Sequence, residues 1–313
     1  MTQTQAVNKS DTQKPRGNWI KYSICGVVVF ITVVLARHPV GVWYRNLAAE
    51  PVDEEAVVQA IDVIEPSGVA FHDGRQSFLV VSDEGQLVEL SPDWQVRNRH
   101  NLRGDLEGVA VHPTTGTILV ADEKTATVFE FDLDMRRILR IWSPDRTKAS
   151  GLPRVGVSNK KIEGVAIAQN PDGTLGLWCV WERNPARVFR IEADLRVAAT
   201  ESARERIRRD LEPERISARV AKCFALGPQQ LNGITWDSTS GLLLAVSAGE
   251  RTLTAFTVEG KTVSTCRIGP SWAEGVCVMP DGTVILTEEN KDRAWTYPKL
   301  GLRWRAKKTA DPR

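Results

Sequence analysis

The segment Glu107-Gly108-Val109-Ala110 opens a short apolar run, and close relatives of it recur along the chain. Five segments share the pattern: Ser67-Gly68-Val69-Ala70, Glu107-Gly108-Val109-Ala110, Glu163-Gly164-Val165-Ala166, Asn232-Gly233-Ile234-Thr235 and Glu274-Gly275-Val276-Cys277. Each is followed by a glycine-containing turn and then by a second apolar run, as in the stretch from Phe78 to Ser82. A glycine turn between two apolar runs is typical of a β-hairpin, because glycine accepts the positive φ that the turn needs.

Further strands follow each hairpin. Residues 127–131 alternate between polar and apolar side chains, whereas 137–142 show a weaker pattern. Four antiparallel strands in about forty residues are typical of one propeller blade. The repeats therefore predict an all-β fold, a five-bladed β-propeller over residues 56–298. The strand-like run 57–64 has no blade of its own, and we expect it to complete the last blade and cover two sheet edges.

Two insertions lengthen the spacing between repeats, at residues 145–159 and 201–222. Within the second, residues 203–209 look helical, and their dense charge fits a solvated helix, with a partner-binding helix as the alternative. A degenerate sixth blade inside this insertion is the main alternative to five blades.

The N-terminal region predicts one transmembrane helix ahead of the propeller. Residues 1–18 are polar and fit a disordered cytoplasmic tail. Residues 19–44 fit a membrane anchor: the apolar run from Trp19 to Ala36 contains the single charge Lys21, and Trp43 and Tyr44 suit the interface. Residues 45–55 then form a linker.

Basic residues in the tail set the expected orientation. Lys9, Lys14 and Arg16 precede the span, so the positive-inside rule places the tail in the cytoplasm. We therefore expect a single-pass protein of the inner cell membrane with its propeller on the extracytoplasmic side. A cleaved signal peptide is the alternative interpretation. A buried core helix fits less well, because the run has no polar face.

Composition excludes several classes of function. The net charge of +2 argues against a nucleic-acid partner. None of the five cysteines forms a Cys-x-x-Cys pair, which argues against a zinc knuckle or thioredoxin-like site. We interpret the cysteines as small core residues, although an extracytoplasmic location permits a disulfide among the four after Cys25. Residues 299–313 are interpreted as a basic C-terminal tail outside the propeller, disordered from Arg303 to Arg313.

Acidic residues recur at two positions of the repeat. In an antiparallel blade, the start of the first strand and the end of the second lie at the same end of the sheet. The strand starts carry Glu107, Glu163, Asn232 and Glu274, which are the candidate metal ligands. The second strands end at or near further candidate ligands, Asp83, Asp122, Glu182 and Glu288. Folding is therefore expected to gather these side chains at one mouth of the central channel.

Gathered carboxylates repel one another and need either a cation or raised pKa values. A ligand set made only of oxygen atoms suits calcium, and the absence of nearby His or clustered Cys argues against zinc. The alternative is that each acid accepts backbone hydrogen bonds or pairs with a nearby cation such as Lys124 or Arg183.

The Glu-Gly-Val-Ala openings, the second strands that end in Ser-Asp-Glu or Thr-Glu-Glu-Asn, and the N-terminal apolar segment resemble the SdiA-regulated, YjiK-like family over residues 56–298. The resemblance implies a five-bladed propeller distantly related to NHL-repeat proteins, with a calcium site and no established activity. Ser67 and Asn232 depart from the glutamate of the pattern, so their blades are expected to supply weaker ligands or none.

These observations favour a membrane-tethered binding or scaffold module for an unknown protein or small-molecule ligand. The alternative is a metal-dependent hydrolase of lactones or phosphate esters that uses the acidic site, with Asp122 or Glu182 as general base. A structural subunit of a membrane complex is a third possibility. No nucleophile elbow, His-Glu-x-x-His motif or phosphate loop is present, and the sequence does not decide whether the protein is an enzyme.

Overall fold

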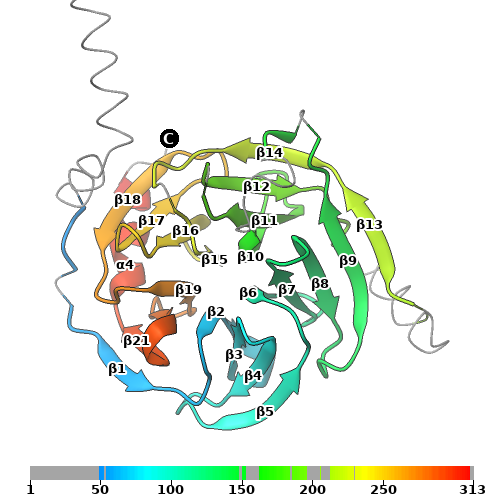
Figure 1. The fold of residues 1–313 in the computed structure, drawn as a ribbon. Coiled ribbons are helices and arrows are strands. Elements are labelled where there is room, and N and C mark those ends of the chain that lie inside the picture. Colours follow the sequence, from blue (N-terminus) through cyan, green and yellow to red (C-terminus); the bar gives the residue numbers. More distant parts are fainter. Residues whose placement is uncertain are drawn as a thin grey trace, which may run out of the picture. The chain divides into compact units, whose positions relative to one another are not determined.

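The computed structural model of the protein describes residues 49–52, 54–147, 150–152, 162–183, 185–195, 205, 212–228 and 230–310. Five sheets surround a central axis in this part of the chain (Figure 1). The innermost strands of neighbouring sheets contact one another in a closed ring, β2 to β6, β10, β15, β19 and back to β2. The fold is the five-bladed propeller that the repeats predict.

The strands of each blade run outward from the axis in chain order, except that the outermost strand of the last blade is the first strand of the chain. Blade 1 contains β2 (Pro66–His72), β3 (Ser77–Ser82), β4 (Gln86–Leu90) and β5 (Val96–Asn101). Blade 2 contains β6 (Leu106–Val111), β7 (Ile118–Asp122), β8 (Thr127–Phe131) and β9 (Ile138–Pro144), with β13 (Glu214–Ala218) at its edge. Blade 3 contains β10 (Ile162–Gln169), β11 (Leu175–Trp181), β12 (Arg187–Ile191) and β14 (Val220–Phe224). Blade 4 contains β15 (Gly233–Asp237), β16 (Leu242–Ser247), β17 (Thr252–Phe256) and β18 (Thr262–Arg267). Blade 5 contains β19 (Ala273–Val278), β20 (Val284–Glu288) and β21 (Arg293–Tyr297), completed by β1 (Val57–Ala60).

The ring closes through the first strand of the chain. Strand β1 pairs antiparallel with β21, and Val57 lies opposite Thr296 in the register. The expectation that the run near residue 57 completes the last blade is thereby confirmed. The described residues form five blades, and the part of the long insertion that the structure describes does not form a sixth.

The second insertion is partly built into the sheets. Strand β13 pairs in parallel with β9 at the edge of blade 2, and β14 then becomes the fourth strand of blade 3. Both strands mix charged and apolar residues, because an edge strand with exposed faces needs no strict alternation. The segment 203–209, interpreted as helical, lies outside the described residues except for Glu205.

Blades pack on one another through apolar side chains. Each of five hydrophobic clusters draws its residues from two adjacent blades. Both faces of the inner strands are therefore buried, which explains continuous apolar runs such as the one in β3. Cys179, Cys266 and Cys277 are buried in these clusters as free thiols, and Cys223 is free and half-buried.

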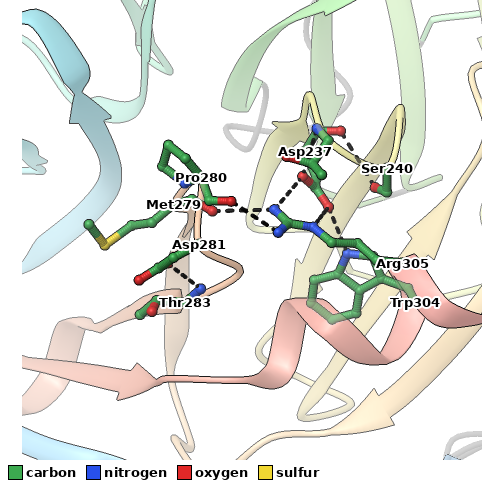
Figure 2. Close-up of polar contacts among 9 residues, drawn as sticks. Asp237, Ser240, Met279, Pro280, Asp281, Thr283, Trp304 and Arg305 are labelled. Carbon is green, nitrogen blue, oxygen red and sulfur yellow. Dashed lines mark hydrogen bonds and ion pairs between the residues drawn. The ribbon is translucent and has the colours of Figure 1, made fainter.

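The C-terminal segment is helical where the sequence analysis expected a disordered tail. Helix α4 (Leu300–Ala310) lies beside blades 4 and 5 (Figure 1). The indole of Trp304 is only 2% exposed and packs in the cluster between these blades. The guanidinium group of Arg305 donates hydrogen bonds to the carboxylate of Asp237 in blade 4 (Figure 2). These two residues hold the segment in place, which is the physical reason for the correction.

The predicted tail, anchor and first part of the linker, residues 1–48, lie outside the described residues. Among the residues that the structure does describe, none belongs to a helix of the length and hydrophobicity needed to cross a membrane.

Candidate metal centre

The repeat glycines lie where the inner strands approach one another most closely. A Cβ atom at Gly108 would lie 2.6 Å from the Cα of Gly164, and a Cβ at Gly233 would lie 2.3 Å from the carbonyl oxygen of Glu274. A Cβ atom at Gly68 or at Gly275 would come equally close to the backbone of the next inner strand. Contacts this short exclude any side chain at these positions, so glycine is what allows the five strands to converge. The residue before each glycine is thereby brought close to the central axis.

β-Bulges determine how two of the acidic residues are placed in their strands. In the pairing of β6 with β7, Leu106 lies opposite Asp122 and Gly108 opposite Ala121, so Glu107 is the extra residue. In the pairing of β10 with β11, Glu163 is the extra residue in the same way. A bulge re-aims a side chain and is common next to functional sites.

Two groups of three carboxylates result, and they share one member. Oxygen atoms of Asp83, Asp105 and Glu107 all lie within 4.8 Å of one another. Oxygen atoms of Glu107, Glu123 and Glu163 are equally close to one another. We call these five residues together with Glu274 the acidic cluster. Asp83 and Asp105 are half-buried, whereas Glu107, Glu123 and Glu163 are buried.

Burial and mutual repulsion raise the pKa values of carboxyl groups in the cluster. Burial raises the pKa values of Glu107 and Glu163 well above the usual range, and neighbouring carboxylates raise them further. The pKa of Glu274 is raised by burial and by carboxylates that include Glu289 and Asp83. The pKa of Asp83 rises to about 6, again mainly through burial, although the hydroxyl of Ser67 lowers it. In the ionised state, the cluster therefore requires positive charge that these side chains do not supply.

Two carboxylate oxygens of the cluster have no hydrogen-bond partner within the described part of the chain. They are Oε1 of Glu163 and Oε2 of Glu274, whose residues are 2% and 6% exposed. Buried polar atoms are usually satisfied, so each of these orphaned oxygens indicates a missing ligand. A cation that prefers oxygen ligands fits this donor set, and calcium is such a cation.

The other predicted ligands make different contacts. Asn232 accepts a hydrogen bond from the amide of Ala248 through Oδ1, and its side chain also hydrogen-bonds to Glu274. Asp122 accepts hydrogen bonds from the amides of Asp105 and Thr125. These contacts fix loops around the cluster and leave less of each side chain to bind a cation.

Glu182 and Glu288 are paired with cations. Glu182 accepts a hydrogen bond from Gln230 and forms an ion pair with Arg183 at 3.0 Å. Glu288 forms an ion pair with Lys291 at 2.8 Å and accepts a hydrogen bond from the indole of Trp295. Burial raises the pKa of Glu288, but these donors outweigh burial and hold it below the usual range. These two residues therefore match the alternative interpretation, in which an acid near a strand end pairs with a nearby cation of the protein.

Asp105 and Glu123 were not among the predicted ligands, although Glu123 directly follows the predicted ligand Asp122. Asp105 precedes β6, and its carbonyl oxygen accepts a hydrogen bond from the amide of Glu123 over 2.8 Å. This bond ties the start of the first strand to the end of the second and brings both acids to the cluster. The sequence signal was the acid two residues before Glu107, a position that is also acidic in the first repeat, where Glu65 precedes Ser67.

Fold and site together define a five-bladed propeller with a buried acidic cluster at one end of its inner strands. The sequence model of the SdiA-regulated family matches residues 49–221, and the chain belongs to that family. The resemblance noted from the repeats is confirmed. No curated protein matches the chain.

The chain is also similar to solved structures of low sequence identity. Glutaminyl cyclase from Myxococcus xanthus is 15% identical, with a TM-score of 0.50, covering 79% of this chain and 97% of that one. A proposed gluconolactonase is 12% identical, with a TM-score of 0.46 and coverage of 81% and 95%. A chain of the nidogen/laminin complex is 16% identical, with a TM-score of 0.44 and coverage of 71% and 72%. At these identities the likeness concerns the fold alone.

Proposed function

We propose that the protein is a membrane-tethered, extracytoplasmic propeller that binds calcium at the acidic cluster and acts as a binding or scaffold module. The observation that carries the calcium proposal is the carboxylate of Glu163. It is buried, one of its oxygens lacks a hydrogen-bond partner among the described residues, and it lies within 4.8 Å of oxygens from Glu107 and Glu123. Glu107, Glu123 and Glu163 would hold the ion, together with Asp83 and Asp105.

A bound calcium ion would supply the positive charge that offsets the repulsion among these carboxylates. The chain's own contribution is to orient the ligands. Strand β6 and the end of β7 bring Glu107 and Glu123 from blade 2, and β10 brings Glu163 from blade 3. Binding would therefore link two blades next to the axis and make the ring harder to open.

Thermal unfolding of the purified full-length protein, with detergent present, tests this proposal. We expect calcium to raise the melting temperature relative to a chelator, because a ligand that binds only the folded state stabilises it. The variant Glu163→Gln should lose most of that rise. Glu288→Gln is the matched control, because Glu288 is also a buried acid at a strand end but is paired with Lys291. A melting temperature that is the same in calcium and in chelator would refute calcium binding.

Tethering and orientation rest on residues 19–44 and on the basic residues before them. Membrane fractionation combined with protease treatment of cells whose outer barrier has been opened tests both. We expect the protein in the membrane fraction and its propeller accessible to the protease. Recovery in the soluble fraction would indicate a cleaved signal peptide or no anchor, and a protected propeller would reverse the orientation.

The hydrolase alternative gains no support from its two candidate bases. Asp122 is bonded to loop amides and Glu182 to Arg183 and Gln230. We therefore favour a binding role, in which the cation organises one end of the propeller for a partner or a small ligand.

A further inference from the structure

We propose that a cavity in blades 2 and 3, at the end opposite the acidic cluster, binds a small carboxylate with an apolar body. The cavity has a volume of 710 Å³. Small-molecule sites usually have volumes of about 300–1,000 Å³. It is lined by the turn that follows β6, the turn between β10 and β11, and the end of β12 with the chain that leaves it. The acidic cluster lies where β6 and β10 begin, so the two sites are separate and the inference goes beyond the proposed function.

Arg190 brings a positive charge to the lining of this cavity. Its Nη1 donates a hydrogen bond to Oδ1 of Asn170 over 2.9 Å, whereas its Nε is buried and has no hydrogen-bond partner within the described part of the chain. Asn170 is only 9% exposed, and its Nδ2 donates to Oγ1 of Thr174 over 2.9 Å, so the amide that holds the guanidinium group is itself fixed. Buried polar atoms are usually satisfied, so the unused donor of Arg190 indicates a place for an acceptor from outside the chain.

The acids around Arg190 are used in other contacts. Glu192 lines the cavity but pairs with Arg219, and Asp172 accepts hydrogen bonds from the amide and the hydroxyl of Thr174. Neither carboxylate forms an ion pair with Arg190 in the part of the chain that the structure describes. The guanidinium group therefore keeps a donor for an anion, and a carboxylate is the anion whose planar geometry it matches.

The rest of the lining selects the body of the ligand. Four apolar side chains belong to it, namely Leu175, Ile191, Ala193 and Leu195. His112 also lines the cavity, but Nδ1 accepts hydrogen bonds from the amides of Thr114 and Thr115, and Nε2 lies 2.7 Å from the carbonyl oxygen of Leu195. Its ring is thus already bonded on both nitrogens. An apolar lining with a cationic donor that orients the ligand is the usual composition of a small-molecule site.

Saturation-transfer NMR of the full-length protein in detergent tests the inference, with hexanoate and its neutral analogue hexanamide as probes. Chelator is present, so the result does not depend on calcium binding. We expect a Kd for hexanoate on the order of 1 mM, because so small a ligand makes few contacts. Hexanamide should bind at least about tenfold more weakly, because it cannot form charge-assisted hydrogen bonds with Arg190.

Three variants locate the site. Arg190→Met should remove the preference for hexanoate over hexanamide, and Ala193→Phe should weaken both probes, because the new ring would fill the cavity. Arg187→Met is the matched control and should bind both probes as the unmutated protein does, because Arg187 lies at the other end of β12.

Equal binding of the two probes by the unmutated protein, or no binding of either, would overturn the inference. This comparison decides the question even where a variant fails to fold, which circular dichroism would reveal. Unchanged binding by folded Arg190→Met and Ala193→Phe would place the probes elsewhere and overturn the inference as well.

Discussion

The carboxylate of Asp237 accepts two hydrogen bonds from the guanidinium group of Arg305, over 3.0 Å from Nε and 2.8 Å from Nη2 (Figure 2). The indole of Trp304 donates a third to the same carboxylate over 3.1 Å. Arg305 also donates to the carbonyl oxygen of Pro280 over 3.1 Å. One buried acid in blade 4 thus fixes helix α4 against blades 4 and 5.

We predict that Arg305→Ala lowers the free energy of unfolding by about 3 kcal/mol, because it leaves the carboxylate of Asp237 buried without a counter-ion. Chemical denaturation monitored by tryptophan fluorescence measures the change. Lys307→Ala is the control on the same helix, since Lys307 pairs with Glu50 and both side chains are at least 40% exposed. The control should change stability little. Equal effects of the two variants would contradict a specific role of Asp237.

The repeat glycines lead to a second prediction. Gly233→Ala should lower the free energy of unfolding by roughly 3 kcal/mol or more, because the new Cβ would lie 2.3 Å from the carbonyl oxygen of Glu274 and must push two inner strands apart. Gly74→Ala is the matched control, since its Cβ would meet only the His72 side chain, at 3.6 Å. The control should stay within about 0.5 kcal/mol of the unmutated protein. A tolerated Gly233→Ala would show that the inner strands can separate.

These glycines also show how far the sequence predicts the structure. The five repeats, the closing strand near Val57 and the gathering of acids at one end followed from period and topology. The sequence did not predict the bulges that leave Glu107 and Glu163 unpaired in their ladders, because a bulge depends on how two strands are registered. It also missed Asp105, whose position depends on a loop hydrogen bond to the amide of Glu123.

Helix α4 and strand β13 were missed for a related reason. Leu300–Ala310 is rich in basic residues and has no clear apolar face, so its periodicity does not indicate a packed helix. Its position depends on Trp304 and Arg305 meeting Asp237, which is distant in the sequence. Strand β13 pairs in parallel at a blade edge, which the local pattern of an antiparallel propeller does not indicate.

The buried ion pair between Arg140 and Glu130 supports a third prediction. Nε of Arg140 lies 2.5 Å from Oε2 of Glu130, and both side chains are at most 2% exposed. Arg140 also donates to the carbonyl oxygen of Asp194 over 2.6 Å, joining blade 2 to the chain that follows β12. Glu130→Gln should cost about 3 kcal/mol of unfolding free energy, because the guanidinium stays buried without its anion.

Glu192→Gln is the control for that measurement. Glu192 pairs with Arg219, but the two side chains are 48% and 70% exposed. Removing this pair should not change the denaturation midpoint measurably, since exposed ion pairs contribute little. If both variants shift the midpoint by the same amount, burial does not set the strength of the Arg140 pair.

The acidic cluster predicts an unusual pH dependence for the metal-free protein. The pKa of Asp83 is raised from 3.8 to about 6, and the pKa values of Glu107 and Glu163 are raised well above 4.5. A raised pKa means that the folded state holds the proton more tightly than the unfolded chain does. The resulting stability is complete below the unfolded-state pKa and is lost as the pH rises through the folded-state value. We therefore expect the melting temperature in chelator to fall as the pH rises from about 4 through about 6 and beyond.

Glu163→Gln isolates this contribution from the other ionisable groups. The glutamine side chain at position 163 stays neutral at every pH. The melting temperature of the variant in chelator should therefore fall less steeply with rising pH than that of the unmutated protein. Saturating calcium should also flatten the curve of the unmutated protein, because the ion binds the ionised carboxylates and stabilises the form that otherwise repels itself. Parallel curves for the two proteins in chelator would mean that Glu163 ionises without penalty. Its burial would then not create the charge deficit on which the calcium proposal rests.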